Sequence, residues 1–161
     1  MDRISQHRRR RQAGLSLVEL IVAFTILLTL SAMALPMARY KVRREKEQSL
    51  RLALREMRTA IDKYKDMADR GELGQTKLGS DNYPETLEIL VEGVKIPGPE
   101  DKKIKFLRRI PKDPFTNNND WGKRSTQDDP KSQSWGGQNV FDVYSKTYER
   151  APDNTPYSEW E

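Results

Sequence analysis

The chain has 161 residues, of which a third are charged, with a formal net charge of +5, one histidine and no cysteine. A globular domain of ordinary size already uses about 100 residues, so two full domains do not fit. Without cysteine the chain can form no disulfide and has no thiol for catalysis or zinc binding. The only histidine is His7, so residues 15–161 also lack the histidine base that Ser-His and Cys-His pairs require.

The positive charge is concentrated in the first 14 residues. They carry one acid and five arginines, which leaves a formal charge of only +1 for the rest of the chain. Clustered basic residues such as Arg8–Arg11 can contact a phosphate backbone. A basic run at the edge of an apolar segment is more often a topology signal. We therefore expect residues 1–14 to steer membrane insertion and the chain to bind no nucleic acid.

Residues 15–38 form an apolar block of 24 residues with a single charge, Glu19. A helix of about 20 apolar residues crosses the hydrocarbon core of a bilayer. A secretory signal peptide has an apolar core of only about 7–15 residues, so this block predicts a transmembrane helix. Its orientation stays open, because five basic residues between positions 39 and 46 match those of the N-terminal run.

A second helical pattern follows directly after the apolar block. Apolar residues at steps of four, three, four and three occupy one helical face: Leu50, Leu54, Met57, Ile61 and Tyr64. This spacing predicts a stripe packed on the protein's own core rather than a cofactor site. The two patterns together predict one helix of about 50 residues, which ends at Gly71 and Gly74.

The remaining chain contains shorter elements. Residues 83–91 predict a short helix with Pro84 in its first turn, and residues 104–110 and 139–145 predict two strands. Residues 111–138 are rich in Pro, Asn, Asp, Gly and Ser, which favours a long irregular loop, and the tail from Ala151 is also loop-like. We expect Trp121 and Trp135 of this loop to pack on the domain.

The junction between the basic run and the apolar block reads Gly14-Leu-Ser-Leu-Val-Glu19. A carboxylate inside hydrocarbon costs a few kcal/mol or more, so it needs a partner, and the block contains no basic residue. Cleavage between Gly14 and Leu15 would create an α-amino group that can offset the desolvation of Glu19. Within one straight helix Glu19 lies about 6 Å along the axis from Leu15, which favours pairing between neighbouring subunits.

These residues resemble the type IV prepilin signature, in which a basic leader ends in Gly and is followed by an apolar residue and a Glu at the fifth position. Pro36 adds to the resemblance, since the family carries a proline near this depth of its long helix, where it weakens or kinks the helix. The resemblance implies that a membrane prepilin peptidase cuts after Gly14 on the cytoplasmic side and methylates Leu15, where Phe is commoner. The alternative is an ordinary single-pass membrane segment with an incidental Glu19.

Beyond residue 50 the chain looks like the major pseudopilin G family of type II secretion systems. The matching segments, in the same order, are IDKYKDM (61–67), YPETLEILV (83–91), RRIPKDPFT (108–116), WGGQNVFDVYS (135–145) and SEW (158–160). The resemblance implies an α+β fold with a long N-terminal helix, transmembrane in its first half and amphipathic in its second, on a small antiparallel sheet with long C-terminal loops.

The same resemblance implies an organisation and a set of partners. Residues 1–14 would be a removed leader, residues 15–38 a transmembrane and polymerisation helix, and residues 39–161 a periplasmic domain. The mature subunit would sit in the bacterial inner membrane, polymerise with copies of itself into a periplasmic fibre, and work with an inner-membrane assembly platform and minor pseudopilins.

Many members of this family bind calcium in the C-terminal loop. Carried over by position, the implied ligands are the carbonyl of Lys146, the carboxylates of Glu149 and Asp153, and Asn154; calcium takes six to eight oxygen ligands. The chain departs from the family where relatives show Gly-Ala-Asp-Gly, since it has Thr-Tyr-Glu-Arg at residues 147–150.

Two other functions compete with the pseudopilin interpretation. A type IV pilus or competence pilus subunit shares Glu19 and Pro36 but normally has a C-terminal disulfide. A membrane-bound hydrolase could use acids such as Asp113 and Asp142, but Asp113 in Lys-Asp-Pro is better explained as a turn former. We therefore predict a structural subunit and not an enzyme.

Overall fold

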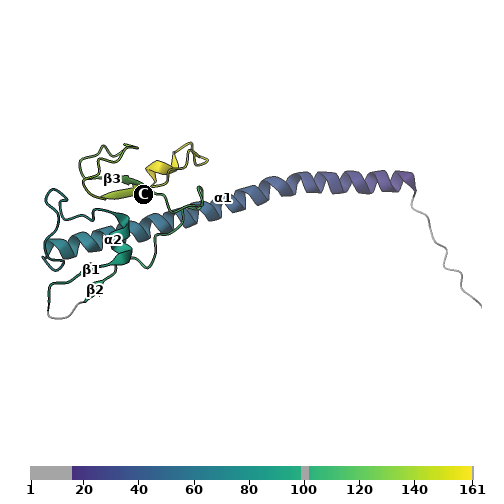
Figure 1. The fold of residues 1–161 in the computed structure, drawn as a ribbon. Coiled ribbons are helices and arrows are strands. Elements are labelled where there is room, and N and C mark those ends of the chain that lie inside the picture. Colours follow the sequence, from purple (N-terminus) through teal and green to yellow (C-terminus); the bar gives the residue numbers. More distant parts are fainter. Residues whose placement is uncertain (1–15, 99–101, 161) are drawn as a thin grey trace, which may run out of the picture. The chain divides into compact units, whose positions relative to one another are not determined.

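The computed structural model describes residues 16–98 and 102–160, with the side chains of residues 33–37 left undescribed. Its elements in chain order are α1 (Leu17–Asp69), α2 (Leu87–Glu92), β1 (Val94–Lys95), β2 (Lys103–Ile104), β3 (Gly122–Arg124), β4 (Asp142–Tyr144) and the 3₁₀ turn η1 (Tyr157–Glu159), shown in Figure 1. The residues form two compact units that divide between Val42 and Arg43. The fold class is α+β, as the sequence predicts.

Helix α1 has 53 residues and confirms the predicted single long helix. It ends where Gly71 adopts a positive φ of 72°, a conformation that glycine reaches without a steric penalty. The amide of Gly71 donates to the carbonyl of Ala68 at 2.9 Å, and the amide of Glu72 donates to that of Met67 at 3.0 Å. These bonds satisfy carbonyls that the last helical turn leaves open.

The first unit contains the start of α1. Its described side chains from Leu17 to residue 32 are all exposed, including Phe24 at 60% and Leu28 at 64%. Over the side chains that the structure describes, no helix combines the length and the apolarity that crossing a membrane requires.

In the second unit, residues 43–161, α1 contributes its amphipathic stripe to the core. Leu50, Leu54, Met57 and Ile61 are fully buried and Tyr64 is 8% exposed, so the predicted stripe is confirmed. Each such buried side chain stabilises the fold by about 1.5–3 kcal/mol relative to an exposed one. The stripe packs with apolar side chains from later segments: Leu87, Leu90, Leu107, Trp121, Val140, Val143 and Tyr157.

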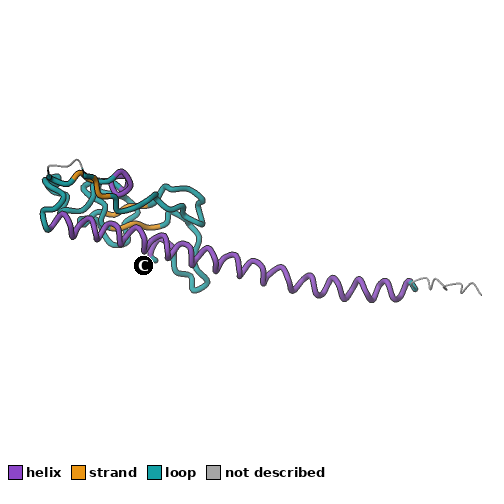
Figure 2. Tube along the Cα trace, turned by 90° about the horizontal axis from the view of Figure 1, so that it is seen from below, coloured by secondary structure: helices purple, strands orange, loops and turns teal. Residues whose placement is uncertain are grey.

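The strands form two separate antiparallel pairs, and most of this unit outside α1 is loop, as the teal tube of Figure 2 shows. In one pair, Val94 lies opposite Ile104 and Lys95 opposite Lys103. The prediction of a strand over residues 104–110 is wrong beyond Ile104. The amides of Phe106 and Leu107 both donate to the carbonyl of Leu90 at 2.9 Å, so this segment closes the end of α2 instead of extending a sheet.

In the second pair, β4 confirms part of the strand predicted over residues 139–145, while β3 lies inside the segment predicted to be an irregular loop. Gly122 of β3 lies opposite Tyr144 of β4. A Cβ atom at Gly122 would lie 2.2–2.5 Å from atoms of the Tyr144 ring. The ring therefore covers the backbone at this position, and only glycine fits beneath it.

Helix α2 begins at Leu87, four residues later than the predicted start at Tyr83. Pro84 is not in a helical turn, because its carbonyl accepts a 2.8 Å hydrogen bond from the amide of Val140. Thr86 is the N-cap, with extended φ and ψ of −143° and 160°. The segment before α2 is thus held extended by the chain that leads into β4.

Trp121 of the long loop packs on the domain, as predicted, whereas Trp135 stays partly exposed. Trp121 is 1% exposed, and its Nε1 donates to the carbonyl of Pro111 at 2.8 Å. Trp135 is 36% exposed; its Nε1 donates to the carbonyl of Asn139 at 2.7 Å, and the Lys123 ammonium lies 4.2 Å from its ring centroid. The buried Trp121 ties residues 111–138 to the core, and β3 is a regular element within them.

Candidate functional site

The predicted processing site lies at the start of α1. Gly14 and Leu15 fall outside the described residues, so the cleavage assignment stays a prediction. The helix begins directly after Ser16, whose carbonyl accepts the amide of Leu20 at 3.0 Å. Helix α1 therefore begins within the Gly14–Glu19 junction.

Glu19 lies in the first turn of α1 and is exposed. It stands three residues after Ser16, which is the spacing of a capping box, and an acid in this turn is favoured by the positive end of the helix macrodipole. The sequence prediction did not consider this spacing, although Ser-Leu-Val-Glu shows it. The exposed carboxylate of Glu19 is accessible to a partner.

Two threonines of the apolar segment are satisfied within α1. The hydroxyl of Thr25 donates to the carbonyl of Ile21 at 2.8 Å, and that of Thr29 donates to Ile26 at 2.8 Å. Such back-bonding lets a hydroxyl sit among apolar side chains without another partner. Helix α1 continues through position 36, and the part that Pro36 plays in assembly stays a prediction.

The predicted calcium ligands lie in the loop after β4. Asp153 accepts the amide of Thr155 at 3.0 Å, and the carbonyl of Asn154 accepts the Arg150 guanidinium at 3.1 Å. The ammonium of Lys146 lies 2.6 Å from Asp120, and the amide of Glu149 donates to the hydroxyl of Thr147 at 3.3 Å.

Calcium needs six to eight oxygen ligands, and this loop as folded does not gather such a set. Among the described residues, no group of three or more His, Cys, Asp or Glu side chains lies close enough together to hold a metal ion. Asp153 and the carbonyl of Asn154 are already engaged by donors of the chain itself. Calcium binding at this loop remains a prediction.

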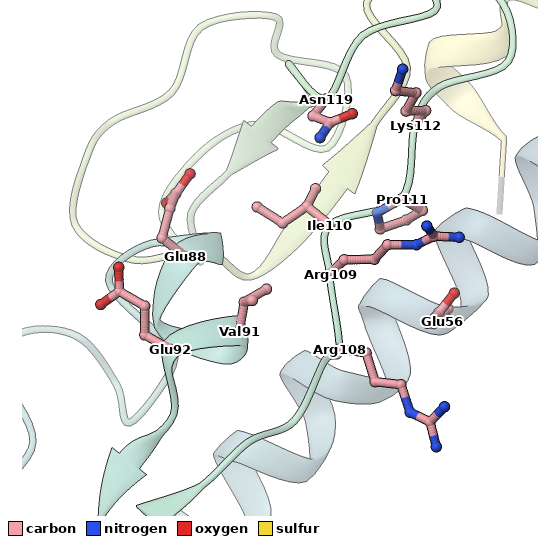
Figure 3. Close-up of a pocket in the computed structure, with 10 residues that line it drawn as sticks. All are labelled: Glu56, Glu88, Val91, Glu92, Arg108, Arg109, Ile110, Pro111, Lys112 and Asn119. Carbon is pink, nitrogen blue, oxygen red and sulfur yellow. The ribbon is translucent and has the colours of Figure 1, made fainter.

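A groove of about 720 Å³ lies between α2 and the segment that follows β2 (Figure 3). Glu88 and Glu92 project from α2 on one side, and three cations line the segment on the other: Arg108, Arg109 and Lys112. Val91 and Ile110 supply apolar surface between them. Opposed charges around an apolar floor suit contact with another protein surface.

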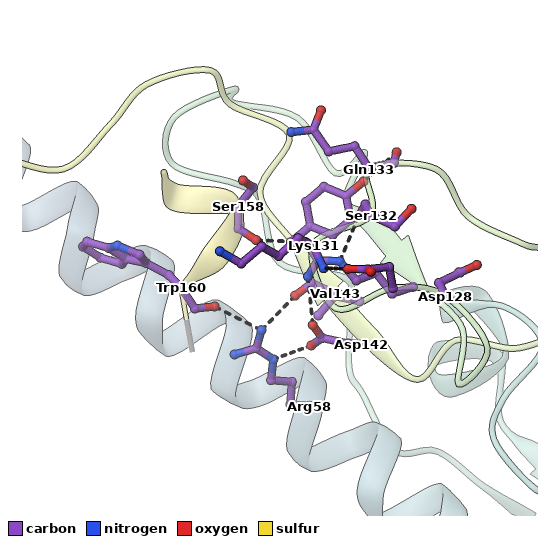
Figure 4. A network of polar contacts seen from close by, with 12 residues as sticks. Arg58, Asp128, Lys131, Ser132, Gln133, Asp142, Val143, Ser158 and Trp160 are labelled. Atoms are coloured by element: carbon purple, nitrogen blue, oxygen red, sulfur yellow. Dashed lines mark hydrogen bonds and ion pairs between the residues drawn. The ribbon is translucent and has the colours of Figure 1, made fainter. Parts of the chain in front are cut away.

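The two acids considered for hydrolysis are both structural. Asp142 lies 2.7 Å from Arg58 and 3.2 Å from Arg124, an arrangement that joins β4 to α1 (Figure 4). Asp113 is fully buried; its carboxylate accepts the amide of Phe115 at 2.8 Å and the hydroxyl of Ser145 at 2.5 Å. The first of these bonds is the predicted turn around Asp113.

Comparison with known proteins identifies the N-terminal segment. Residues 9–35 match the family model described as the prokaryotic N-terminal methylation motif. No curated protein and no solved structure matches the chain. The matched range contains Gly14, Leu15 and Glu19, and Pro36 lies one residue beyond it.

The motif and the fold together define a class. The chain carries a type IV prepilin-like N-terminus on a long helix that continues into a small α+β domain. The motif indicates a type IV pilin-like N-terminus and implies processing by a prepilin peptidase and pilus-like polymerisation.

Proposed function

We propose that the chain is a pseudopilin, a subunit of the periplasmic fibre of a type II secretion system. Residues 1–14 are removed at the Gly14–Leu15 bond, residues 15–38 hold the mature chain in the bacterial inner membrane, and residues 39–161 face the periplasm. Subunits then leave the membrane into a fibre that helps to push folded proteins out of the cell. The chain itself catalyses no reaction.

The observation that carries the proposal is the methylation motif at the start of α1. The apolar residues of 17–32 are exposed, and in water such a surface must be covered by lipid or by other protein chains. Membrane insertion before assembly and helix packing after it would each cover this surface. The 24-residue apolar block with one charge supports the first of these states.

Glu19 supplies the charge through which neighbouring subunits pair. Its exposed carboxylate is the only charge of the apolar block, and cleavage supplies an α-amino group near the start of the same helix. A subunit entering the fibre places its own new amine close to a neighbour's Glu19, and the pair offsets the cost of burying both charges. The partners are copies of the chain, the prepilin peptidase, the inner-membrane assembly platform and minor pseudopilins.

A type IV pilus or competence pilus subunit is the alternative, since it shares the same N-terminal motif. Two features favour the pseudopilin. The chain has no cysteine for the C-terminal disulfide common in true pilins, and its segments after residue 50 resemble pseudopilins in order and content.

A complementation experiment separates the two functions. Cells that lack the chain are supplied with the wild type, with Gly14→Trp, or with Gln12→Ala, a control that changes the leader but not the junction. The proposal expects folded exoproteins to accumulate inside cells with Gly14→Trp and to reach the medium with the wild type and the control. Normal secretion together with loss of surface pili or of DNA uptake would instead establish the pilus subunit.

A further inference from the structure

Three arginines of α1 contact the C-terminal segment of the chain. Arg43 donates to the carbonyl of Arg150 and, at 3.2 Å, to the hydroxyl of Tyr157. The guanidinium of Arg51 lies 4.4 Å from the centroid of the Trp160 ring. These contacts, and those of Arg58 with Trp160, follow the helix at steps of eight and seven residues, which keeps them on one side of α1.

Arg58 makes three hydrogen bonds (Figure 4). It donates to the carbonyls of Val143 and Trp160, each at 3.1 Å, and to the carboxylate of Asp142 at 2.7 Å. Beside it, Arg124 donates to the carbonyl of Ser158 at 3.1 Å. The planar guanidinium has five donors in a fixed fork and can therefore join several carbonyls at once. Residues 158–160 are thus hydrogen-bonded to α1 through Arg58 and to β3 through Arg124.

The loop between β4 and this segment is closed by donors of the chain itself. The amide of Ala151 donates to the carbonyl of Thr155 and the amide of Asn154 to that of Ala151, both at 2.9 Å. Arg150 forms an isolated bridge with Pro156, and its guanidinium donates to the carbonyl of Asn154. Two cationic side chains, Arg43 and Arg150, therefore bond carbonyls of the very loop in which calcium was predicted.

We propose that Arg43, Arg51 and Arg58, here named the arginine ladder, fasten the C-terminal segment in place of a bound calcium ion. A metal site closes a loop by drawing its carbonyls and carboxylates toward one positive centre. In this chain the positive groups are covalently part of α1 and of the loop. The loop consequently folds and holds its shape at any calcium concentration.

Residues 147–150 supply one of the cations that close this loop. They read Thr-Tyr-Glu-Arg. The fourth of these residues, Arg150, supplies both the guanidinium that bonds Asn154 and the carbonyl that Arg43 bonds. A divalent ion placed here would meet two guanidinium groups, whose charge repels it.

The test uses the full chain in detergent and measures trypsin cleavage at the Arg150–Ala151 bond by mass spectrometry. The carbonyl and the amide of this peptide bond are both hydrogen-bonded. The Arg150 carbonyl accepts from the Arg43 guanidinium, and the Ala151 amide donates to the carbonyl of Thr155. We expect the wild type to be cut equally slowly in millimolar calcium and in excess EGTA. Its thermal midpoint, followed by tryptophan fluorescence, should also be the same in both.

Substitution then identifies what holds the loop. Arg43→Met should accelerate cleavage at this bond several-fold in calcium and in EGTA alike. Arg55→Met, at an exposed position of the same helix, is the matched control and should leave the rate unchanged. Unchanged protection in Arg43→Met would overturn the ladder.

The comparison of calcium with EGTA needs no variant, so it decides the proposal even if Arg43→Met fails to fold. Faster cleavage of the wild type in EGTA, or a higher thermal midpoint in calcium, would show that a metal closes the loop. All of these contacts lie within residues 43–160, so the result is independent of whether the leader is removed at Gly14.

Discussion

The two regions of helix α1 use apolar side chains in opposite ways. Residues 17–32 are apolar around the helix, and every described side chain there is exposed. Between Leu50 and Tyr64 one stripe of apolar side chains is buried to 0–8%, while charged residues occupy most of the other faces. A helix that is apolar on all sides is expected to contact lipid or other protein chains. A helix with one apolar stripe is expected to pack that stripe on the core of its own domain.

We infer from this difference that the two regions of α1 have different functions. The first region carries the methylation motif and the single acid, Glu19, which serve processing and assembly in the function that we propose. The second region organises the folded domain through its stripe. Substitutions in the two regions should therefore affect different measurements.

The largest expected effect is on assembly, from Glu19→Gln. This change keeps the shape and removes the charge, so a neighbour's α-amine loses its partner. Breaking a buried ion pair by removing one partner costs about 3–5 kcal/mol, which weakens subunit association at least about a hundredfold. Fibre yield by sedimentation and electron microscopy checks this. Glu45→Gln, exposed outside the motif, is the control and should assemble normally.

The thermal midpoint of Glu19→Gln should equal that of the wild type, because Glu19 is remote in sequence from the buried stripe. Normal fibre yield with Glu19→Gln would contradict the role given to the acid.

The next effect is on the stability of the domain, from Leu54→Ala. Removing a fully buried leucine costs about 2–5 kcal/mol through lost transfer energy and a residual cavity, and Leu54 is 0% exposed. Leu27→Ala, at a position 60% exposed, is the matched control. Thermal unfolding of the full chain in detergent should show a lower midpoint only for Leu54→Ala. Equal losses from both variants would remove the distinction between the two regions.

A smaller loss of stability is expected from Asp113→Ala. The change leaves the amide of Phe115 and the hydroxyl of Ser145 without their buried acceptor, at about 1–3 kcal/mol for each orphaned group. Asp120→Ala is the control, because its ion pair with Lys146 is exposed and such pairs contribute about 0–1 kcal/mol. Chemical denaturation compares the two. A larger loss from Asp120→Ala would contradict the structural role of Asp113.

The smallest effect concerns alkaline pH. Burial raises the pKa of the Tyr157 hydroxyl above its ordinary value of 10, the bond to Glu47 adds to this, and Arg43 opposes it. The folded chain therefore holds this proton more tightly than the unfolded chain does. The resulting stability is complete below pH 10 and is lost as the pH rises through the higher folded pKa.

Above pH 10 the free energy of unfolding should accordingly fall less steeply for Tyr157→Phe than for the wild type. Tyr148→Phe is the control, since Tyr148 is 96% exposed and should leave the slope unchanged. The same alkaline slope in Tyr157→Phe and in the wild type would rule out this contribution.

The features that the sequence predicts well are those with a strong local pattern. The steps from Leu50 to Tyr64 predict the buried stripe, and Gly71 predicts the end of α1, because helical periodicity and positive φ leave clear marks on residue choice. The Gly14–Glu19 junction predicts the methylation motif for a similar reason. These patterns needed no knowledge of distant contacts.

The errors arise where distant contacts decide the local structure. The sequence pattern places Pro84 in the first turn of a helix, but the Pro84 carbonyl accepts a hydrogen bond from the amide of Val140, which is distant in the sequence. Residues 104–110 have the pattern of a strand, but the amides of Phe106 and Leu107 donate to the carbonyl of Leu90 in α2. Strand β3, Gly-Lys-Arg, has no β-branched residue to mark it and depends on pairing with β4.

The central claim is that the first region of α1 becomes the N-terminus of an assembling subunit, and mass spectrometry of the mature chain tests it most directly. The account predicts a chain that begins at methylated Leu15 when the prepilin peptidase is present and retains residues 1–14 when Gly14 is replaced by Trp. A wild-type chain that keeps its first 14 residues, or a Gly14→Trp chain cut at the same bond, would contradict it.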